Sequence, residues 1–554
     1  MSDEQLGQSS DFEQPPLSEE EESSQSRVPV FSTVRTLLIS IPLALLAGLI
    51  AGLCSVLVMS LLRLWAGIPT PMELFGDYYL QTIDVNAFIR LLMTFKNGPK
   101  TEPLGLALLA MIAIGTLMGL LYAILARIKL PTVGYRPGRR ELLTALAFAL
   151  VMTLTAVILF WDQIRQNNLG FPIDTARILT SVGLFLSFAV YAFVLCLVYR
   201  AWLPKYPRPH TNVVAARRRL LLARSGSIAL GIAAGLGAKA TIDEFLTNFA
   251  AYDGMKTSFQ NHIIHPISTN DEHYVVTQNV VDPSPNIAVW RLEVSGLVNK
   301  PGNYTYDEFQ KLPSTSRAIT LECIANGPSD HLMGNAIWQG VPFSSLLELH
   351  GGAQSTAEYV AFYSVDGYTI SQPLKEVLAV DTLLAYRMNG AEIPRRHGYP
   401  LRVLLPGHYG EENPKWLTRI ALTNDFVGGL YSNQGWYNGP LHTTSRIDQP
   451  YATSVISVGE TVPMGGIAFA GNRGIQKVEV SVDGGVTWRP TTLDPAISKD
   501  SWVFWKTTWR PTASGIYTLM VRAVDGTGAP QISKIQGTVP NGATGYDKLL
   551  VTVK

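Results

Sequence analysis

One cysteine stands alone in the C-terminal part of this 554-residue chain. Cys323 follows an apolar, β-branched stretch, and the other two cysteines, Cys54 and Cys196, lie inside long apolar runs. Cys323 therefore has no partner for a disulfide or for a cysteine-ligated zinc or iron–sulfur centre. A single thiolate can still be the one protein ligand of a soft metal whose other ligands come from a cofactor. The alternative is a free cysteine that packs as a small hydrophobic side chain.

A second segment with chemical potential runs from His397 to Trp416. An apolar strand candidate, Leu401–Leu405, leads into a loop rich in Gly and Pro that ends at Lys415. We expect His397, Arg402 and Lys415 to cluster at the ends of this strand and in the loop. Backbone N–H groups beside an arginine and a lysine suit a phosphate or another anion. The alternative is an ordinary surface loop with basic residues.

Other common functional signatures are missing from the sequence. It contains no Walker A motif, no G-x-G-x-x-G after a strand, no G-x-S-x-G nucleophile elbow and no H-E-x-x-H. The formal net charge of +1 argues against a nucleic-acid partner. Nucleotide-binding and hydrolase functions therefore lack their usual marks.

Apolar runs dominate the first 245 residues. Each of the first four is long enough to cross a bilayer, which takes about 20 residues, and the fifth is weaker. They are Thr36–Leu64, Leu104–Ala126, Leu142–Trp161, Ile178–Tyr199 and Leu220–Ala238. Their length and scarcity of charge exclude ordinary core helices. We predict a transmembrane region of about five helices at 35–245 in contact with a lipid bilayer, preceded by a disordered polar tail at 1–34.

Loop charge predicts the orientation of these helices. Basic residues gather in the segments between runs two and three and between runs four and five, whereas the other two loops are balanced. Because basic loops stay in the cytoplasm, we expect a cytoplasmic N-terminus and an extracytoplasmic C-terminal half in a multi-pass cell-membrane protein. The run Arg217–Arg219 before the weak fifth helix is similar to a twin-arginine export signal, although it would serve equally well as a positive anchor.

Residues 246–446 combine short strand and helix signals, and 447–554 alternate like an all-β domain. Strands are expected at Trp290–Val294 and Tyr359–Phe362 and a helix at Phe343–His350. In the last part, Val478–Val482 leads into the hairpin signal at Asp483 and Gly484, which predicts an immunoglobulin-like sandwich.

Several segments, in the right order, resemble the sulfite oxidase family. Leu321–Asn326 looks like the segment that holds the molybdenum-binding cysteine, and His397–Trp416 resembles the pterin-phosphate loop. Similar segments lie between them, at Asn335–Phe343, Asp366–Tyr368 and Leu384–Gly390. The resemblance runs from about Asp271 to the C-terminus. The expected architecture is thus a membrane α-helical bundle, an α+β sulfite-oxidase-like molybdopterin domain and an all-β immunoglobulin-like sandwich, through which this family often dimerises.

The resemblance implies a molybdenum–molybdopterin cofactor and a role for seven residues. Cys323 would be the thiolate ligand of the metal, and the residues that hold the pterin and its phosphate would be Asn279, Ser364, His397, Arg402, Asn413 and Lys415. Sulfite oxidases carry an Arg-Asn-His run where this chain has Thr277-Gln278-Asn279. The missing arginine disfavours sulfite and leaves room for a neutral or organic small substrate, and Trp436 or Tyr437 is expected to line its pocket.

The sequence also bears on electron transfer. No histidine precedes His210, and no C-x-x-C-H motif occurs, so neither haem nor an iron–sulfur cluster is predicted. A separate carrier, a quinone or a cytochrome, should then exchange electrons with the protein. We therefore predict a membrane-anchored molybdenum-cofactor oxidoreductase that catalyses two-electron oxygen-atom transfer outside the cytoplasm. The alternative is a non-catalytic extracytoplasmic binding or scaffold module on a membrane anchor.

Overall fold

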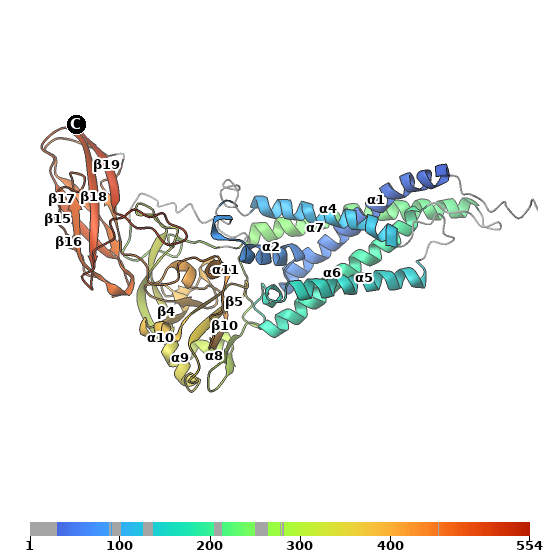
Figure 1. Cartoon of the computed structure of the whole chain (residues 1–554), viewed down its shortest axis with the longest axis horizontal. Coiled ribbons are helices and arrows are strands. Elements are labelled where there is room, and N and C mark those ends of the chain that lie inside the picture. The colour runs from blue at the N-terminus through green and yellow to red at the C-terminus, as the bar shows by residue number, and fades with distance from the viewer. Residues whose placement is uncertain are drawn as a thin grey trace, which may run out of the picture.

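The computed structural model describes residues 30–87, 90, 101–125, 137–203, 213–249, 264–277, 279, 282–452 and 454–554. Figure 1 shows three parts in chain order: a helical bundle, a central domain and a C-terminal β-sandwich. The predicted tail lies outside the described residues up to residue 29, and a helix already begins at Val30.

Five long helices form the bundle: α1 (Val30–Ala66), α4 (Thr101–Leu125), α5 (Arg139–Leu159), α6 (Ile173–Trp202) and α7 (Val213–Phe249). Each contains a stretch long and apolar enough to cross a membrane, which confirms the five predicted runs. These stretches are Ser40–Ala66, Leu106–Ile124, Arg139–Leu159, Ile173–Trp202 and Arg217–Glu244. Their outer surface carries exposed leucines and isoleucines, as a lipid-facing surface does.

Small residues let the bundle pack closely around α1. A Cβ atom added to Gly119 of α4 would lie 2.9 Å from the Cα of Gly48 of α1, so the two backbones touch where neither residue has a side chain. On α6, the hydroxyl of Tyr191 donates to the carbonyl of Gly115 at 2.6 Å. The bundle is thus held by backbone proximity and interhelical hydrogen bonds, the usual means inside lipid.

The bundle joins the central domain through two short elements, α2 (Pro71–Thr82) and the 3-10 turn η1 (Gln163–Arg165). The backbone N–H of Asn167 donates to the carbonyl of Val365 at 3.1 Å, and Gln434 donates to the carbonyl of Leu80 at 2.8 Å. Both elements lie in the two loops, between apolar runs one and two and between runs three and four, in which acidic and basic residues balance. The predicted basic segments connect the opposite ends of the helices, and their residues 126–136 and 204–212 lie outside the described part of the chain.

Two sheets form the central domain. The first has the strand order β2-β1-β10-β5-β6, in which β1 and β10 run parallel and the other neighbours antiparallel. Its strands are β1 (Leu292–Gly296), β2 (Gly302–Tyr304), β5 (Tyr359–Ser364), β6 (Thr369–Pro373) and β10 (Leu417–Thr423). The second has the order β3-β4-β7-β8, with β9 also paired to β7. Its strands are β3 (Thr315–Glu322), β4 (Met333–Pro342), β7 (Leu383–Met388), β8 (Ala391–Glu392) and β9 (Arg402–Leu404).

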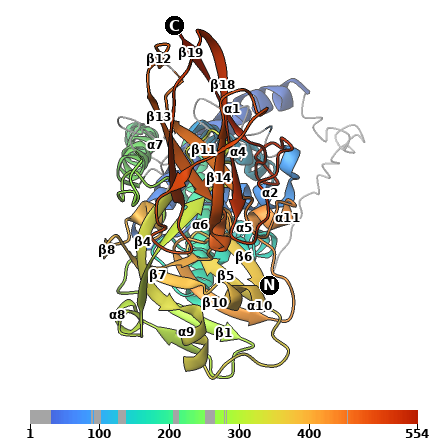
Figure 2. The ribbon, with the colours of Figure 1, turned by 90° about the vertical axis from the view of Figure 1, so that its left-hand side faces the viewer.

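Short helices and turns cover these sheets and fill the connections (Figure 2). They are α8 (Tyr306–Gln310), α9 (Phe343–Leu349), α10 (Leu374–Ala379), α11 (Leu430–Asn433), η3 (Arg395–His397) and η4 (Gly410–Glu412). The helix predicted at Phe343–His350 and the strand predicted at Tyr359–Phe362 are confirmed by α9 and β5. Trp290 was expected on a strand but precedes β1, where its fully buried indole donates to the carbonyl of Leu417.

The C-terminal domain is a two-sheet β-sandwich. One sheet has the order β11-β13-β17-β16 and the other β12-β19-β18-β14-β15, and they share a core that includes Trp505, Leu519 and Val551. The strands are β11 (Thr444–Gln449), β12 (Val455–Ile456), β13 (Val462–Phe469), β14 (Ile475–Ser481), β15 (Arg489–Pro490), β16 (Thr492–Leu493), β17 (Val503–Trp509), β18 (Gly515–Asp525) and β19 (Asp547–Val553), with the turn η5 (Gly471–Arg473). The assignment as immunoglobulin-like stays a prediction.

Candidate cofactor-binding site

Cys323 is the first residue after strand β3 and sits in a tight turn. Its N–H donates to the carbonyl of Leu332 at 2.9 Å, and its own carbonyl accepts from the N–H of Asn326 at 2.8 Å. The Asn326 side chain locks the turn, because it accepts from the N–H of Leu332 and donates to a carboxyl oxygen of Glu322. The thiol is therefore held in place by backbone geometry, and Cys323 is only 7% exposed.

The surroundings of the Cys323 thiol do not favour a free thiolate. Burial, followed by the nearby Glu411 carboxyl, raises the pKa of Cys323 to about 12. The group is therefore a neutral thiol at pH 7 when no cation is bound. A metal cation would reverse this preference, because metal coordination deprotonates a thiol.

Arg402 begins strand β9 and is 4% exposed. Its guanidinium donates to the carbonyls of His397 at 2.9 Å and Asn413 at 3.2 Å and lies over the Trp338 ring at 5.0 Å. Its Nε has no hydrogen-bond partner among the described residues, and none of their carboxylates forms an ion pair with it. Burial lowers the pKa of Arg402 to about 10. A buried cation with only neutral partners is an incomplete arrangement that an anion would complete.

Two further basic residues stand beside Arg402. A glycine brings them together: Gly398 has a φ of +114°, and a Cβ there would lie 3.1 Å from the Cβ of Arg402 and 3.0 Å from that of Lys415. The ammonium of Lys415 donates to the carbonyl of Arg396 at 3.1 Å, and the imidazole Nε2 of His397 lies 2.7 Å from the carbonyl of Asn270. His397, Arg402 and Lys415 thus form one cluster at the start of β9 and the end of the following loop.

His397 contributes polarity to this cluster rather than charge. Burial and the neighbouring His273 hold the pKa of His397 well below its usual range, so the imidazole is neutral. The rings of His273 and His397 meet edge to face, with centroids 5.3 Å apart.

Asn279 and Ser364 lie on the Lys415 side of the cluster. The amide of Asn279 donates to a carboxyl oxygen of Asp366 at 2.7 Å, and Asp366 is within electrostatic range of Lys415. Ser364 ends strand β5, and its hydroxyl is buried without a hydrogen-bond partner among the described residues. An unsatisfied buried hydroxyl costs free energy, so Ser364 also points to a ligand.

The side chain of Asn413, unlike those of Asn279 and Ser364, is hydrogen-bonded within its own loop. Its side-chain oxygen accepts from the N–H of Leu405 at 2.6 Å, and its side-chain amide donates to the carbonyl of Tyr409 at 2.7 Å. These bonds close the loop between β9 and Lys415 on itself. Asn413 therefore shapes the loop and offers Arg402 its backbone carbonyl, while its side-chain groups are used within the protein.

Tyr274 links the cysteine to the basic cluster. It packs in one buried cluster with Cys323 and Trp338, and its hydroxyl is within electrostatic range of both Cys323 and Arg402. A Cβ on Gly410 would lie 2.4 Å from this hydroxyl and 3.5 Å from the carbonyl oxygen of Glu322. Only a glycine lets the loop pass so close to the tyrosine beside the cysteine turn.

Two residues near the thiol were missed by sequence reasoning, Glu411 and Tyr431. Neither carboxyl oxygen of Glu411 has a hydrogen-bond partner among the described residues, and burial raises its pKa well above the usual range. Tyr431 of α11 is within electrostatic range of Cys323 and Glu411. The sequence did contain a signal for Glu411, because two adjacent acids, Glu411 and Glu412, are unusual in a loop that otherwise resembles an anion-binding loop. The residues around Tyr431 in the sequence gave no such signal.

Trp436 and Tyr437, the aromatic residues expected to line the substrate pocket, pack against different partners. Trp436 packs on Tyr431 with ring centroids 4.5 Å apart and so supports that tyrosine. Tyr437 stacks on His442, and its hydroxyl donates to the carbonyl of Pro440. Tyr431 is thus, like Tyr274, an aromatic residue within electrostatic range of the thiol.

The donor set fits one elongated ligand with an anionic end and a metal end. Among the described residues, no group of three or more His, Cys, Asp or Glu side chains could hold a metal ion, so a metal at Cys323 must bring most of its ligands with it. Among the described residues, Arg402 has no acidic counter-ion and the Ser364 hydroxyl has no hydrogen-bond partner, as expected if both face a phosphorylated molecule. A metal-carrying pterin with a terminal phosphate meets both requirements.

Comparison with known families gives the same assignment for this half of the chain. Residues 279–431 match the oxidoreductase molybdopterin binding domain, and residues 438–539 match the Mo-co oxidoreductase dimerisation domain.

Curated relatives cover parts of the chain. Sulfite oxidase of Arabidopsis thaliana is 28% identical over 249 residues, which are 36% of this chain and 63% of the relative. Nitrate reductase [NADH] 1 of the same plant is 26% identical over 295 residues (42% and 32%). A protein of Azospira oryzae, named as a candidate protein-methionine-sulfoxide reductase subunit YedZ1, is 34% identical over 154 residues (27% and 56%). This chain therefore spans less than two thirds of the length of each.

A solved structure, the sulfane dehydrogenase SoxCD of Paracoccus pantotrophus, is 22% identical with a TM-score of 0.49 and covers 56% of this chain and 90% of that one. The two consecutive domain matches and the sulfite oxidase relatives agree with the geometry of the site, in which the turn at Cys323 lies near the basic cluster of His397, Arg402 and Lys415. Residues 279–539 belong to the sulfite oxidase family of molybdopterin-dependent oxidoreductases.

Proposed function

We propose that this protein is a membrane-anchored molybdenum-cofactor enzyme that transfers an oxygen atom, with two electrons, to or from a small neutral substrate outside the cytoplasm. One observation carries the proposal. Buried Arg402, which has no acidic partner among the described residues, and the buried lone cysteine Cys323 both lie within electrostatic range of Tyr274 in one domain.

Each residue has a definable task in this proposal. Arg402 and Lys415 hold the terminal phosphate by charge, and His397 adds a neutral polar contact. Asn279 and Ser364 hydrogen-bond the pterin, Asn413 positions the loop, and Cys323 gives the metal its thiolate. When bound, the cofactor supplies two-electron oxygen-atom chemistry. The protein orients it, and the burial of Cys323, Ser364 and Arg402 keeps bulk water away from both ends of the site.

The substrate is inferred from the charge beside Cys323. Glu322 and Glu411 are both buried near the thiol, and both raise its pKa. Thr277 stands where the family's substrate arginine is expected. Since burial raises the pKa of both acids, they can donate a proton to a neutral oxide but give an anionic substrate such as sulfite or nitrate no counter-charge, so a neutral S-oxide or N-oxide fits better. The Azospira oryzae relative, whose name refers to methionine sulfoxide, supports an S-oxide that is reduced.

The placement in the cell is part of the proposal. The two charge-balanced loops adjoin the central domain, and the basic segments connect the other ends of the helices, which favours a cytoplasmic N-terminus and an extracytoplasmic catalytic domain. Arg217–Arg219 lie in α7 at the start of its apolar stretch, where they serve as a cytoplasmic anchor or as a twin-arginine export signal. Electrons come from a separate quinone or cytochrome.

We also propose that the C-terminal sandwich has an immunoglobulin-like fold and forms a homodimer. The match of residues 438–539 to a dimerisation domain supports this assembly.

The test compares substrates on the purified full-length protein with a reduced viologen as electron donor. We expect turnover of methyl sulfoxides or aryl N-oxides and little with nitrate, and little oxidation of sulfite when ferricyanide is the acceptor. Glu411→Gln keeps the shape of the buried acid but not its proton, and should impair sulfoxide reduction while leaving cofactor content unchanged. A native protein that contains neither molybdenum nor pterin would favour the scaffold alternative instead.

A further inference from the structure

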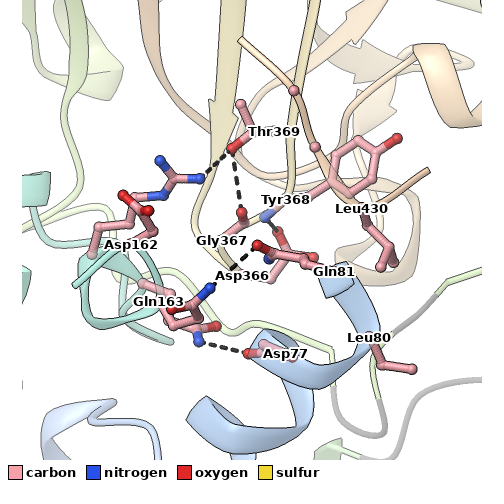
Figure 3. A pocket seen from close by; sticks show the side chains of 14 residues that line it. Asp77, Leu80, Gln81, Asp162, Gln163, Asp366, Gly367, Tyr368, Thr369 and Leu430 are labelled. Carbon is pink, nitrogen blue, oxygen red and sulfur yellow. Dashed lines mark hydrogen bonds between the residues drawn. The ribbon is translucent and has the colours of Figure 1, made fainter. Parts of the chain in front are cut away.

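A cleft opens where the membrane bundle meets the central domain (Figure 3). One wall comes from α2 and η1 of the bundle, and the other comes from the turn Asp366–Thr369 and from Leu430 of the central domain. Residues almost 290 positions apart thus share one cavity, and none of them belongs to the cofactor-binding set described above.

The cleft lies at the level of the membrane surface. Only four residues separate the end of α1 from the start of α2, and η1 follows closely on the end of α5. Trp65 and Trp161 at these two helix ends are 73% and 51% exposed, and Phe75 and Tyr79 on α2 are about half exposed. Exposed aromatic side chains at the ends of apolar helices mark the membrane–water interface. The cleft is therefore placed where a molecule with a bilayer-embedded tail would present its polar head group.

The lining of the cleft offers hydrogen-bonding groups in pairs. Gln166 donates to the carboxyl of Asp77 at 2.6 Å, and Gln163 donates to Gln81 at 3.2 Å (Figure 3). Leu80 and Leu430 add apolar surface between these polar groups. A flat ring with oxygen atoms at opposite ends would find donors, acceptors and apolar contacts in this arrangement.

The inner wall of the cleft leads to the cofactor-binding residues. Asp366 on this wall accepts the hydrogen bond of Asn279, and the hydroxyl of Tyr368 donates to the backbone carbonyl of Glu411 at 2.5 Å. Tyr368 also packs on Tyr431, with ring centroids 5.9 Å apart. A ligand in the cleft is thus separated from the cofactor-binding residues by a single turn of chain.

We infer that this cleft binds the head group of a membrane quinol and that the bundle presents this electron donor to the cofactor. The inference rests on the proposed function and identifies its electron partner. Asp77 accepts a hydrogen bond from one quinol hydroxyl, and the Gln81–Gln163 pair serves the opposite oxygen. Burial raises the pKa of Asp77 to about 7, which suits a group that takes up a proton as the quinol is oxidised.

The overall reaction balances as QH2 + XO → Q + X + H2O, in which Q is a quinone and XO is an S-oxide or N-oxide. Two O–H bonds of the quinol break, and the two electrons that it loses are the two that XO gains; the cofactor, when bound, would relay them between the two sites. The oxygen atom leaves XO, and two protons are released by the quinol and two are used to form water.

The experiment uses the full-length protein loaded with cofactor in phosphatidylcholine nanodiscs free of native quinone. Decylubiquinol and a reduced viologen are compared as donors for sulfoxide reduction, and an azido-ubiquinone photolabel is mapped by mass spectrometry. We expect the label on peptides from 71–82, 162–170 or 366–369. We expect Asp77→Asn to raise the KM for decylubiquinol about ten-fold, as loss of a hydrogen bond to a charged acceptor would.

Controls separate the two proposals. Asp84→Asn makes the same change at an exposed acid two residues beyond α2 and should leave quinol kinetics unchanged. Both variants should keep the parent rate with viologen, which does not need the cleft. If viologen supports turnover but the label maps elsewhere, or is displaced by excess phosphatidylglycerol and not by quinone, the quinol site is overturned while the proposed function stands. If viologen gives no turnover of any oxide, the proposed function fails, whether or not the label maps to the cleft.

Discussion

Arg402→Met should separate cofactor binding from folding. Methionine replaces the aliphatic part of the arginine side chain and is compatible with burial, but only arginine carries the guanidinium and its charge. In the structure this charge has carbonyls and an indole as partners and no acid among the described residues. If a phosphate is its natural partner, the charge is needed when the cofactor binds and is a burden when it does not.

The magnitudes can be worked from the surroundings of Arg402. Burial lowers its pKa from 12.5 to about 10, so keeping the charge in the cofactor-free protein costs about 3 kcal/mol at 1.36 kcal/mol per pKa unit. Removing the side chain leaves the carbonyls of His397 and Asn413 without that donor, which costs about 1–3 kcal/mol each. These effects oppose each other, so the stability of the cofactor-free protein should lie between a gain of about 1 kcal/mol and a loss of about 3 kcal/mol. Loss of a buried charge partner from the phosphate should weaken cofactor binding by about 3 kcal/mol or more, which is over a hundred-fold.

The assay measures both quantities on the same preparations. Pterin content is determined by fluorescence after oxidative release, and thermal unfolding is followed on protein made without molybdate. Arg387→Met is the matched control, because Arg387 is partly exposed and makes one long hydrogen bond of 3.4 Å. Arg402→Lys should fall between parent and Arg402→Met, since lysine keeps the charge but lacks the planar fork of donors.

Two results would refute this reasoning. A parent-like pterin content in Arg402→Met would show that the guanidinium does not bind the phosphate. A large loss of cofactor-free stability in Arg402→Met, with none in the control, would make Arg402 a structural residue whose hydrogen bonds outweigh its burial.

Three other changes test separate parts of the account. Gly398→Ala should lower cofactor content strongly, because its φ of +114° disfavours a side chain and the new Cβ would press on Arg402 and Lys415. Pterin release measures the cofactor content. Gly352→Ala controls for backbone strain, because Gly352 also has a positive φ but faces open space. Ser364→Ala should leave the melting temperature of the cofactor-free protein unchanged or slightly raised, since this buried hydroxyl has no hydrogen-bond partner among the described residues, yet should weaken cofactor retention several-fold in a dilution assay; a destabilised cofactor-free variant contradicts this view. Hydrogen bonds from Thr487 hold the pKa of Asp483 well below its usual range. This carboxylate therefore stabilises the fold above about pH 4 and loses that effect as the pH falls through its lowered pKa. The difference in melting temperature between the parent and Asp483→Asn should shrink as the pH is lowered from 7 to 3, and a constant difference contradicts the assignment.

The features that sequence reasoning recovered are local ones. The five membrane helices are contiguous apolar runs, and their length alone distinguishes them from core helices. His397, Arg402 and Lys415 lie within 19 residues of one another, so a single strand followed by a loop brings them together. The lone cysteine is likewise visible in the sequence as a residue type.

The features that it did not recover depend on long-range packing. Cys323 approaches the loop between β9 and Lys415 because β3 pairs with β4, β4 with β7 and β7 with β9. No local sequence pattern encodes this strand order. Tyr431 reaches the thiol from a four-residue helix more than a hundred positions away. Asn413 resembled a cofactor contact in sequence, and only the structure shows that its side chain closes its own loop. The cleft joins Asp77 to Asp366 across two parts of the chain, so it has no sequence signal either.

The most direct test of the account is the sulfur coordination of molybdenum, measured by X-ray absorption on the full-length protein and on Cys323→Ser, with metal and pterin content determined on the same samples. We predict about one molybdenum and one pterin per chain in the parent, and one sulfur ligand fewer in the variant. An unchanged sulfur count, or a parent protein that takes up no molybdenum when molybdate is supplied, would contradict the assignment of Cys323 as the metal ligand.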